Sequence, residues 1–209
     1  MRVIVLTTGR SGSTTFARAC RHIGNFTSGH ELNKAKLAAD RVIIPDNHIE
    51  SDNRLTWLLG RLEKCYGDDA CYVWLKRSEG EVCDSYARRW GAKDLIMEGY
   101  FHAILQYPEY SEVKRSLIAA DYVSTVHANI ELFLRDKNRK MVFHLHTAHA
   151  DFERFWYWIG ARGDLSKALS EWDVAHNASL NGSRYSIVQR GVRKVGRIFR
   201  KLPVFLKTA

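Results

Sequence analysis

The opening stretch constrains the fold of this chain more than any other part. The apolar run from Val3 to Leu6 is rich in β-branched residues and predicts a buried strand. Glycine, serine and threonine follow at once, and the apolar residues between Phe16 and Ile23 recur with the spacing of one helical face. A strand, a small-residue loop and a helix gather backbone N–H groups at the positive end of a helix dipole. This order predicts a phosphate-binding loop.

The residue types of the loop suit an anion. Glycine allows a tight turn and a close approach of the ligand, and hydroxyl groups donate further hydrogen bonds. The only cation is Arg10, and the Lys that the G-x-x-x-x-G-K-[ST] pattern requires is missing. A tight turn without a ligand is the plainer alternative. The candidate phosphate-binding residues are Gly9, Arg10, Ser11, Gly12, Ser13, Thr14 and Thr15.

This loop resembles the 5′-phosphosulfate loop of sulfotransferases that use 3′-phosphoadenosine 5′-phosphosulfate (PAPS). A second segment resembles the 3′-phosphate clamp of the same family: residues 72–77 predict a buried strand that ends in two cations, and a helix capped by Ser78 and Glu81 follows. The resemblance implies that Arg77 and Ser85 hold the 3′-phosphate, because a guanidinium fork and a hydroxyl grip one phosphate from two sides.

The alternation of predicted strands and helices indicates an α/β fold with a mostly parallel sheet flanked by helices. The resemblance implies that this fold has the P-loop-like sulfotransferase architecture, and it also implies a reaction. The reaction is in-line transfer of a sulfuryl group from PAPS to a hydroxyl or amine, with Arg10 neutralising charge on the leaving group and no metal required. The acceptor is not identified and is a small molecule, a glycan or a lipid. The competing hypotheses are an ATP-dependent phosphotransferase and a non-catalytic nucleotide-binding module.

Three residues are candidates for the base that deprotonates the acceptor. Glu31 lies 21 residues after Arg10, close to the spacing of the base in several sulfotransferase branches, and His30 precedes it. Residues 41–45 predict a short strand, which places His48 near a strand end, where other branches carry a catalytic histidine. The sequence leaves the choice open.

The positive charge of the chain belongs to its end. The formal net charge is +9, but eight of the 32 Lys and Arg residues lie in residues 184–209, which contain no acid. We therefore expect an α/β domain over residues 1–183 and a basic amphipathic helix or tail over 184–209. Such a helix suits an anionic membrane, or it packs on the domain with a solvated basic face. No nucleic-acid motif accompanies it, so sequence-specific nucleic-acid binding is not expected.

Further patterns concern location, metals and the remaining elements. No secretory signal precedes the first strand, no apolar run is long enough for a bilayer, and the four cysteines lack metal-type spacing. We expect a cytoplasmic protein with reduced thiols, with the inner face of a membrane as a further location. The histidines at 144, 146 and 149 lack a completing ligand, so no metal site is expected. Residues 92–139 read as helical, 140–146 as a strand, and 152–159 as a helix capped by Asp151.

Overall fold

The computed structural model describes residues 1–90, 96–106 and 112–174. The chain divides into two compact units. Of the described residues, the first contains 1–77 and 129–174, and the second contains 78–90, 96–106 and 112–128. The predicted division at residue 184 stays a prediction, because the tail lies outside the described residues.

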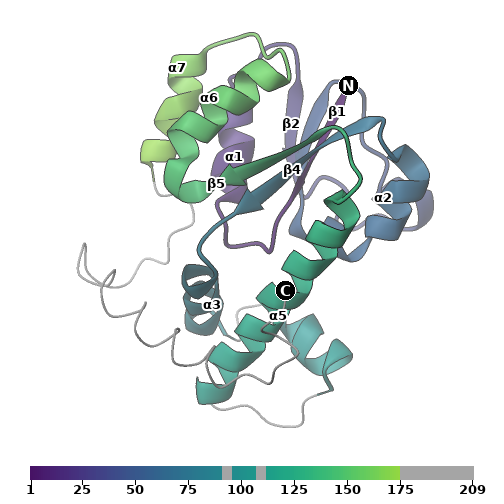
Figure 1. The fold of residues 1–209 in the computed structure, drawn as a ribbon, viewed down its shortest axis with the longest axis vertical. Helices are drawn as coiled ribbons and strands as arrows, with labels where there is room; N and C mark the ends of the chain where they lie inside the picture. The colour runs from purple at the N-terminus through teal and green to yellow at the C-terminus, as the bar shows by residue number, and fades with distance from the viewer. Residues whose placement is uncertain (91–95, 107–111, 175–209) are drawn as a thin grey trace. The chain divides into compact units, whose positions relative to one another are not determined.

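The first unit is built on a five-stranded sheet in which every pair of neighbouring strands is parallel (Figure 1). The strand order is β2-β3-β1-β4-β5, which places β1 at the centre. This confirms the predicted α/β class with a parallel sheet. The strands are β1 (Arg2–Leu6), β2 (Thr27–His30), β3 (His48–Ser51), β4 (Ala70–Lys76) and β5 (Lys140–His144).

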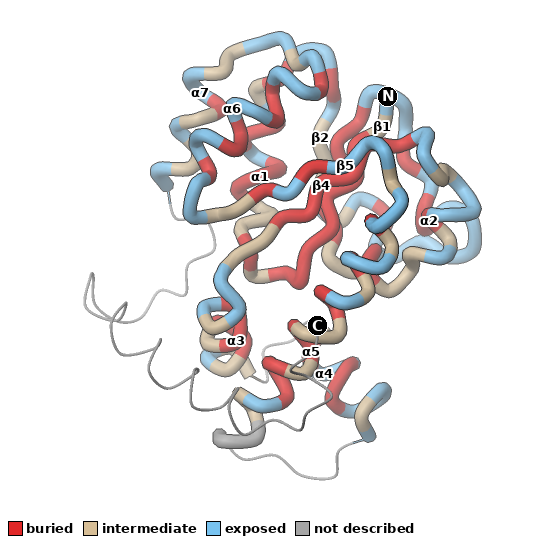
Figure 2. The backbone as a smooth tube through the Cα atoms, viewed as in Figure 1, coloured by how far each residue is buried: buried red, intermediate tan, exposed pale blue. Residues whose placement is uncertain are grey.

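One face of the sheet carries the main hydrophobic core. Alternate residues such as Val3, Val5 and Val73 point to this face, because successive side chains of a strand alternate between faces. At its centre Phe16 makes edge contacts with Phe143, with a ring-centroid distance of 5.2 Å. The helices on this face are α1 (Ser13–Cys20), α6 (Ala148–Trp158) and α7 (Leu165–Ser170), and Figure 2 shows their inner sides buried.

The opposite face packs against α2 (Leu59–Tyr66) and the last residues of α5 (Glu112–Leu134). Tyr72 of β4 is fully buried, and its ring lies 5.0 Å from the ring of Phe133. The sheet is therefore flanked by helices on both faces, as predicted. Short 3₁₀ turns connect the elements at Ala38–Arg41, Asn53–Trp57, Leu145–Thr147 and Glu171–Asp173.

The described part of the second unit is helical. It holds α3 (Glu79–Arg88), α4 (Ile96–Gly99), a π-helical turn (Tyr100–Ile104) and most of α5. Tyr122 of α5 connects these helices through aromatic contacts. The centroid of its ring lies 5.4 Å from that of Tyr86 and 5.3 Å from that of Tyr100. Since α3 begins directly after Ser78, the predicted helix start is confirmed, but Ser78 makes no side-chain capping bond.

Two predicted boundaries are wrong. Residues 41–45 form no strand, and the strand begins at His48 instead. Helix α6 begins at Ala148, so Asp151 lies inside its first turn, where the carboxylate accepts a 2.6 Å hydrogen bond from the N–H of His144. Within the described ranges, no helix combines the length and apolar character that crossing a bilayer requires.

Candidate functional site

Several sequence-predicted residues meet at the carboxyl edge of the sheet. From β1 the chain moves to the β2 and β3 side, and from β3 it crosses to β4 on the other side of β1. Open parallel sheets bind ligands beyond the carboxyl ends of the strands at such a change of direction. The loop after β1 and Arg77 after β4 lie at this edge.

The loop after β1 has an unusual backbone. Gly9, Arg10 and Gly12 have φ values of 76°, 57° and 92°, in the left-handed region. The hydroxyl of buried Ser11 stabilises this backbone. It donates a 3.2 Å hydrogen bond to the carbonyl of Gly9, and its Oγ lies 3.0 Å from Oγ1 of Thr8. Ser11 therefore shapes the loop from within, whereas Ser13, Thr14 and Thr15 open α1.

Gly12 is also needed for space. A Cβ atom at this position would lie 2.8 Å from Cδ1 of Leu145, in the turn after β5. The segment after β5 therefore packs directly against the loop after β1.

Arg77 connects the two predicted phosphate-binding segments. Its Nη1 donates a 3.2 Å hydrogen bond to the carbonyl oxygen of Arg10, 67 residues earlier. This bond joins the end of β4 to the loop after β1. Ser85, the other predicted clamp residue, is buried on α3 in the second unit.

Two of the three candidate bases lie at the end of β2. Nε2 of His30 is 3.1 Å from Oγ of Ser13, so the imidazole contacts the first residue of α1. Glu31 follows with φ 59°, and its carboxylate forms a 2.9 Å ion pair with Arg54. The histidine of this pair thus contacts the first residue of the helix that follows the predicted loop.

The third candidate, His48, is not at the carboxyl edge, and that predicted position is wrong. It begins β3 opposite Arg2, so it lies at the amino end of the sheet. The buried imidazole lies 2.7 Å from Oγ1 of Thr27 and 3.1 Å from Oε2 of Glu50, and the other Glu50 oxygen accepts a 3.0 Å bond from the N–H of Leu32. This arrangement cross-links β2 to β3 and makes His48 structural.

The sequence pattern pointed to Asp52 only as a helix cap or as a residue that lines an acceptor pocket, and not as an acid at the carboxyl end of a strand. Asp52 directly follows β3, next to the end of β1, and the mistaken strand over residues 41–45 hid this position. Its buried carboxylate forms a 2.7 Å ion pair with Arg41 and accepts a 2.8 Å hydrogen bond from the N–H of Arg54. Its charge is thus already compensated by the protein.

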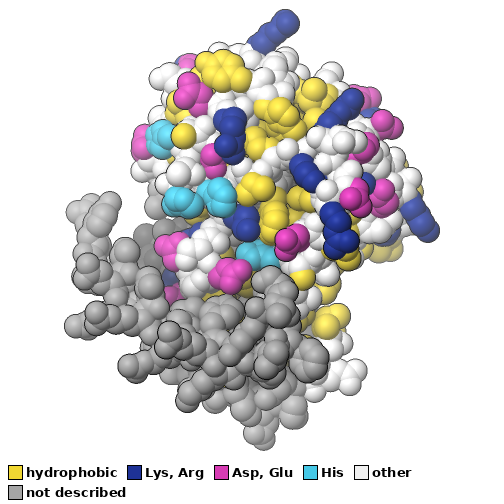
Figure 3. All heavy atoms as spheres, viewed as in Figure 1, with side chains coloured by type: hydrophobic (Ala, Val, Ile, Leu, Met, Phe, Trp, Pro, Cys, Tyr) yellow, Lys and Arg dark blue, Asp and Glu magenta, His cyan; other side chains and the backbone are white. Residues whose placement is uncertain are grey.

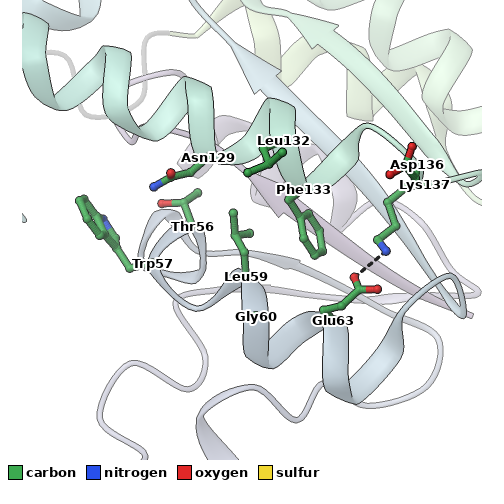
Figure 4. Close-up of a pocket in the computed structure, with 10 residues that line it drawn as sticks. All are labelled: Thr56, Trp57, Leu59, Gly60, Glu63, Asn129, Leu132, Phe133, Asp136 and Lys137. Atoms are coloured by element: carbon green, nitrogen blue, oxygen red, sulfur yellow. Dashed lines mark ion pairs between the residues drawn. The ribbon is translucent and has the colours of Figure 1, made fainter.

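The sequence also gave no sign of a pocket of about 540 Å³ on the other side of the sheet (Figure 4). It lies between α2 and the end of α5, and a 2.5 Å ion pair between Lys137 and Glu63 borders one end. Its lining comes from two helices that are distant in sequence, which a linear pattern cannot reveal. The lining residues are Thr56, Trp57, Leu59, Gly60, Glu63, Asn129, Leu132, Phe133, Asp136 and Lys137.

The histidines after β5 form no metal centre within the described part of the chain, where no group of three or more possible ligands is found. The rings of His144 and His146 lie 5.3 Å apart, and His149 pairs with Asp173 at 3.0 Å. Figure 3 shows histidine side chains near a Lys or Arg side chain over the ends of β4 and β5.

Comparison with known proteins does not assign this chain to a family. No family model matches this chain, and neither a curated protein nor a solved structure matches it.

Proposed function

We propose that this chain is a PAPS-dependent sulfotransferase with the P-loop-like sulfotransferase architecture. The contact between Arg77 and Arg10 carries the proposal. Two segments that separately resemble the 5′ and 3′ phosphate sites of one family lie within hydrogen-bond distance of each other. A nucleotide with phosphates at both positions suits this pairing, because a single adenosine has to reach both sites.

The residues of the loop fit the donor. The N–H groups at the start of α1, with Arg10 and the hydroxyls of Ser13 and Thr14, bind the 5′-phosphosulfate and stabilise the charge that develops on the leaving phosphate. Arg77 binds the 3′-phosphate. The predicted part of Ser85 in this clamp stays a prediction, because Ser85 belongs to the second unit. The acceptor oxygen forms a bond to sulfur while the bond between sulfur and the phosphate oxygen breaks, and 3′-phosphoadenosine 5′-phosphate leaves.

Among the candidate bases, we favour His30. Its imidazole contacts Ser13 at the start of α1, and it can take the acceptor's proton as the oxygen attacks. Glu31 is the second choice because Arg54 holds its carboxylate. His48 is buried at the far end of the strands and has no place in this chemistry.

The second candidate function is an ATP-dependent phosphotransferase. Asp52 favours it, since an acid at the end of the strand beside β1 is suited to Mg²⁺. Two observations oppose it. Arg41 neutralises Asp52, and Gly12 is followed by Ser13, where the ATP-binding pattern has a lysine. None of the four cysteines is in a disulfide, which agrees with our proposal of a cytoplasmic protein.

Thermal-shift measurements test the proposal with three nucleotides: 3′-phosphoadenosine 5′-phosphate, ATP and GTP. We expect the bisphosphate to raise the melting temperature and ATP and GTP to raise it less. A preference for ATP would replace the sulfotransferase by the phosphotransferase. Sulfuryl transfer from PAPS to a phenol then distinguishes an enzyme from a non-catalytic nucleotide-binding module.

A further inference from the structure

We propose that Asp151 and Arg154 of α6 protect the free edge of the sheet at β5 from pairing with a strand of another chain. Strand β5 comes last in the order β2-β3-β1-β4-β5, so β4 is its one neighbour in the described sheet. An edge strand presents backbone N–H and C=O groups that can bind a further strand. We call Asp151 and Arg154 the edge cap, because their side chains bind such groups of β5.

The register between β4 and β5 identifies the backbone groups at the free edge. The N–H of Tyr72 in β4 donates a 2.8 Å hydrogen bond to the carbonyl of Arg139, directly before β5. Every second residue of a strand bonds to a given neighbour, so the bonding to β4 continues at residues 141 and 143. The backbone of Val142 and of His144 therefore faces the free edge, where an added strand would bind.

The edge cap occupies these groups. Nη2 of Arg154 donates a 2.8 Å hydrogen bond to the carbonyl of Val142, and the N–H of His144 donates a 2.6 Å bond to Oδ2 of Asp151. The two side chains also form an ion pair with each other at 3.2 Å. The side chain of Arg154 is 60% exposed, yet its guanidinium binds the strand. A new strand would have to break these bonds before it could pair.

The composition of β5 explains why this edge needs protection. Met141, Val142 and Phe143 are three consecutive apolar residues, and Val142 is 39% exposed. An exposed apolar edge strand is a site of association between chains. The other edge strand, β2, has the sequence Thr-Ser-Gly-His, which contains no apolar side chain and a glycine that weakens strand pairing. The edge cap thus lies at the edge whose sequence favours association.

The charged residue of β5 serves another purpose. Lysine on an edge strand commonly opposes association. Nζ of Lys140, however, donates 2.7 Å hydrogen bonds to the carbonyls of Leu134 and Arg135 at the end of α5. Its charge therefore stabilises the end of a helix, and we assign the protection of β5 to the edge cap. This inference goes beyond the proposed transferase and does not depend on it.

Arg154→Ala in the full chain tests the proposal. Light scattering after size-exclusion chromatography measures association over a range of protein concentrations. We expect this variant to associate at roughly tenfold lower concentration than the natural chain, since one competing hydrogen bond of about 1.4 kcal/mol is removed. The matched control is Glu153→Ala, because Glu153 is exposed on the same helix and makes no bond to β5 within the described residues. Equal association by the two variants overturns the proposal and leaves the edge cap as a fastening of α6 to β5.

A second substitution shows whether β5 is the surface that associates. Val142→Lys places a charge on the edge strand without restoring the edge cap. We expect the double variant Arg154→Ala/Val142→Lys to associate no more than the natural chain. Association as strong as that of Arg154→Ala alone would assign it to another surface and overturn the proposal. So would association that appears only at urea concentrations at which Arg154→Ala unfolds, since the unfolded chain would then be the species that associates.

Discussion

The guanidinium of Arg77 donates a hydrogen bond to the backbone carbonyl of Arg10, and the two atoms lie 3.2 Å apart. The bond ties the loop after β1 to the end of β4. We propose that Arg77 has two tasks, since it fixes the loop through this bond and would bind the 3′-phosphate of the donor. The following variants separate these tasks.

Replacement of Arg77 tests the 3′-phosphate site. We expect Arg77→Ala to weaken binding of 3′-phosphoadenosine 5′-phosphate by about 10- to 100-fold, in line with the loss of a charge-assisted hydrogen bond of about 1.5–3 kcal/mol. Binding of adenosine 5′-phosphate should fall less. Isothermal titration calorimetry measures both, and Arg135→Ala is the control. Equal losses for the two ligands would mean that Arg77 only holds the loop.

Gly12→Ala tests the packing of the loop. The new Cβ needs a left-handed backbone and meets Leu145 at 2.8 Å, so we expect a loss of about 1–3 kcal/mol in the free energy of unfolding. Urea denaturation measures it. The control is Gly60→Ala in α2, where no atom lies within 4 Å of the new methyl group, and which should be neutral or stabilising by up to about 1 kcal/mol. Similar values for both variants would contradict the described loop.

His30→Asn tests the proposed base. Loss of general base catalysis should lower the rate of sulfuryl transfer from PAPS to a phenol by roughly 10²- to 10⁴-fold. Affinity for 3′-phosphoadenosine 5′-phosphate should stay within a factor of a few. Glu31→Gln serves as the competing variant in the same assay. If Glu31→Gln loses the rate and His30→Asn keeps it, the base is Glu31.

His48→Asn tests the structural assignment of that residue. The change leaves Glu50 buried at 2% exposure and removes a hydrogen-bond partner, so we expect a loss of about 1–3 kcal/mol in unfolding free energy. The exposed His146→Asn should stay within about 0.5 kcal/mol. Folding measured in urea and transfer measured at saturating PAPS separate the roles. A folded His48→Asn protein with normal stability and no activity would restore His48 as a catalytic residue.

The thiols predict a pH dependence. Burial raises the pKa of Cys83 to about 12, and it also raises the pKa values of Cys20 and Cys71. In the unfolded chain these thiols have their ordinary pKa, so as the pH rises the unfolded state loses these protons before the folded state does. Stability should therefore be complete below about pH 8.5 and decline as the pH rises above it.

Thiol reactivity measures the same burial directly. At pH 8 a thiol reagent should modify Cys65 quickly, because it is exposed, and the three buried thiols only after unfolding. Cys65→Ser should show no fast phase. A second fast thiol in the native protein would show that one of the buried environments is wrong.

The sequence predicted those elements whose pattern lies within one contiguous segment. The apolar run of β1, the small-residue loop and α1 are contiguous, and so are β4 and the start of α3. The convergence of Arg10 and Arg77 followed from parallel strands that end at one edge. For these parts the sequence was sufficient because each strand is buried on both faces and therefore continuously apolar.

The predictions failed where a distant partner decides the structure. Strand β3 contains the polar residues His48 and Glu50. They are tolerated because their side chains hydrogen-bond to each other in the space that a side chain at Gly29 would fill. Residues 42–45 are apolar and therefore resembled a strand more than residues 48–51 did. In the structure the hydroxyl of Tyr66 hydrogen-bonds to the backbone of Val42 and Ile44. The pocket between α2 and α5 was not predicted for the same reason, since the residues that line it are distant in sequence and meet only in the folded chain. A single sequence carries no record of such contacts.

Gly29 has a consequence for natural variation of this protein. A Cβ at this position would lie 2.4 Å from Oε2 of Glu50 and 2.9 Å from Nε2 of His48, so these side chains already occupy the volume of a methyl group. Positions 29, 48 and 50 should therefore change together during evolution. Descendants that exchange the two polar residues for smaller apolar ones gain room for alanine at 29, whereas alanine arising first is selected against.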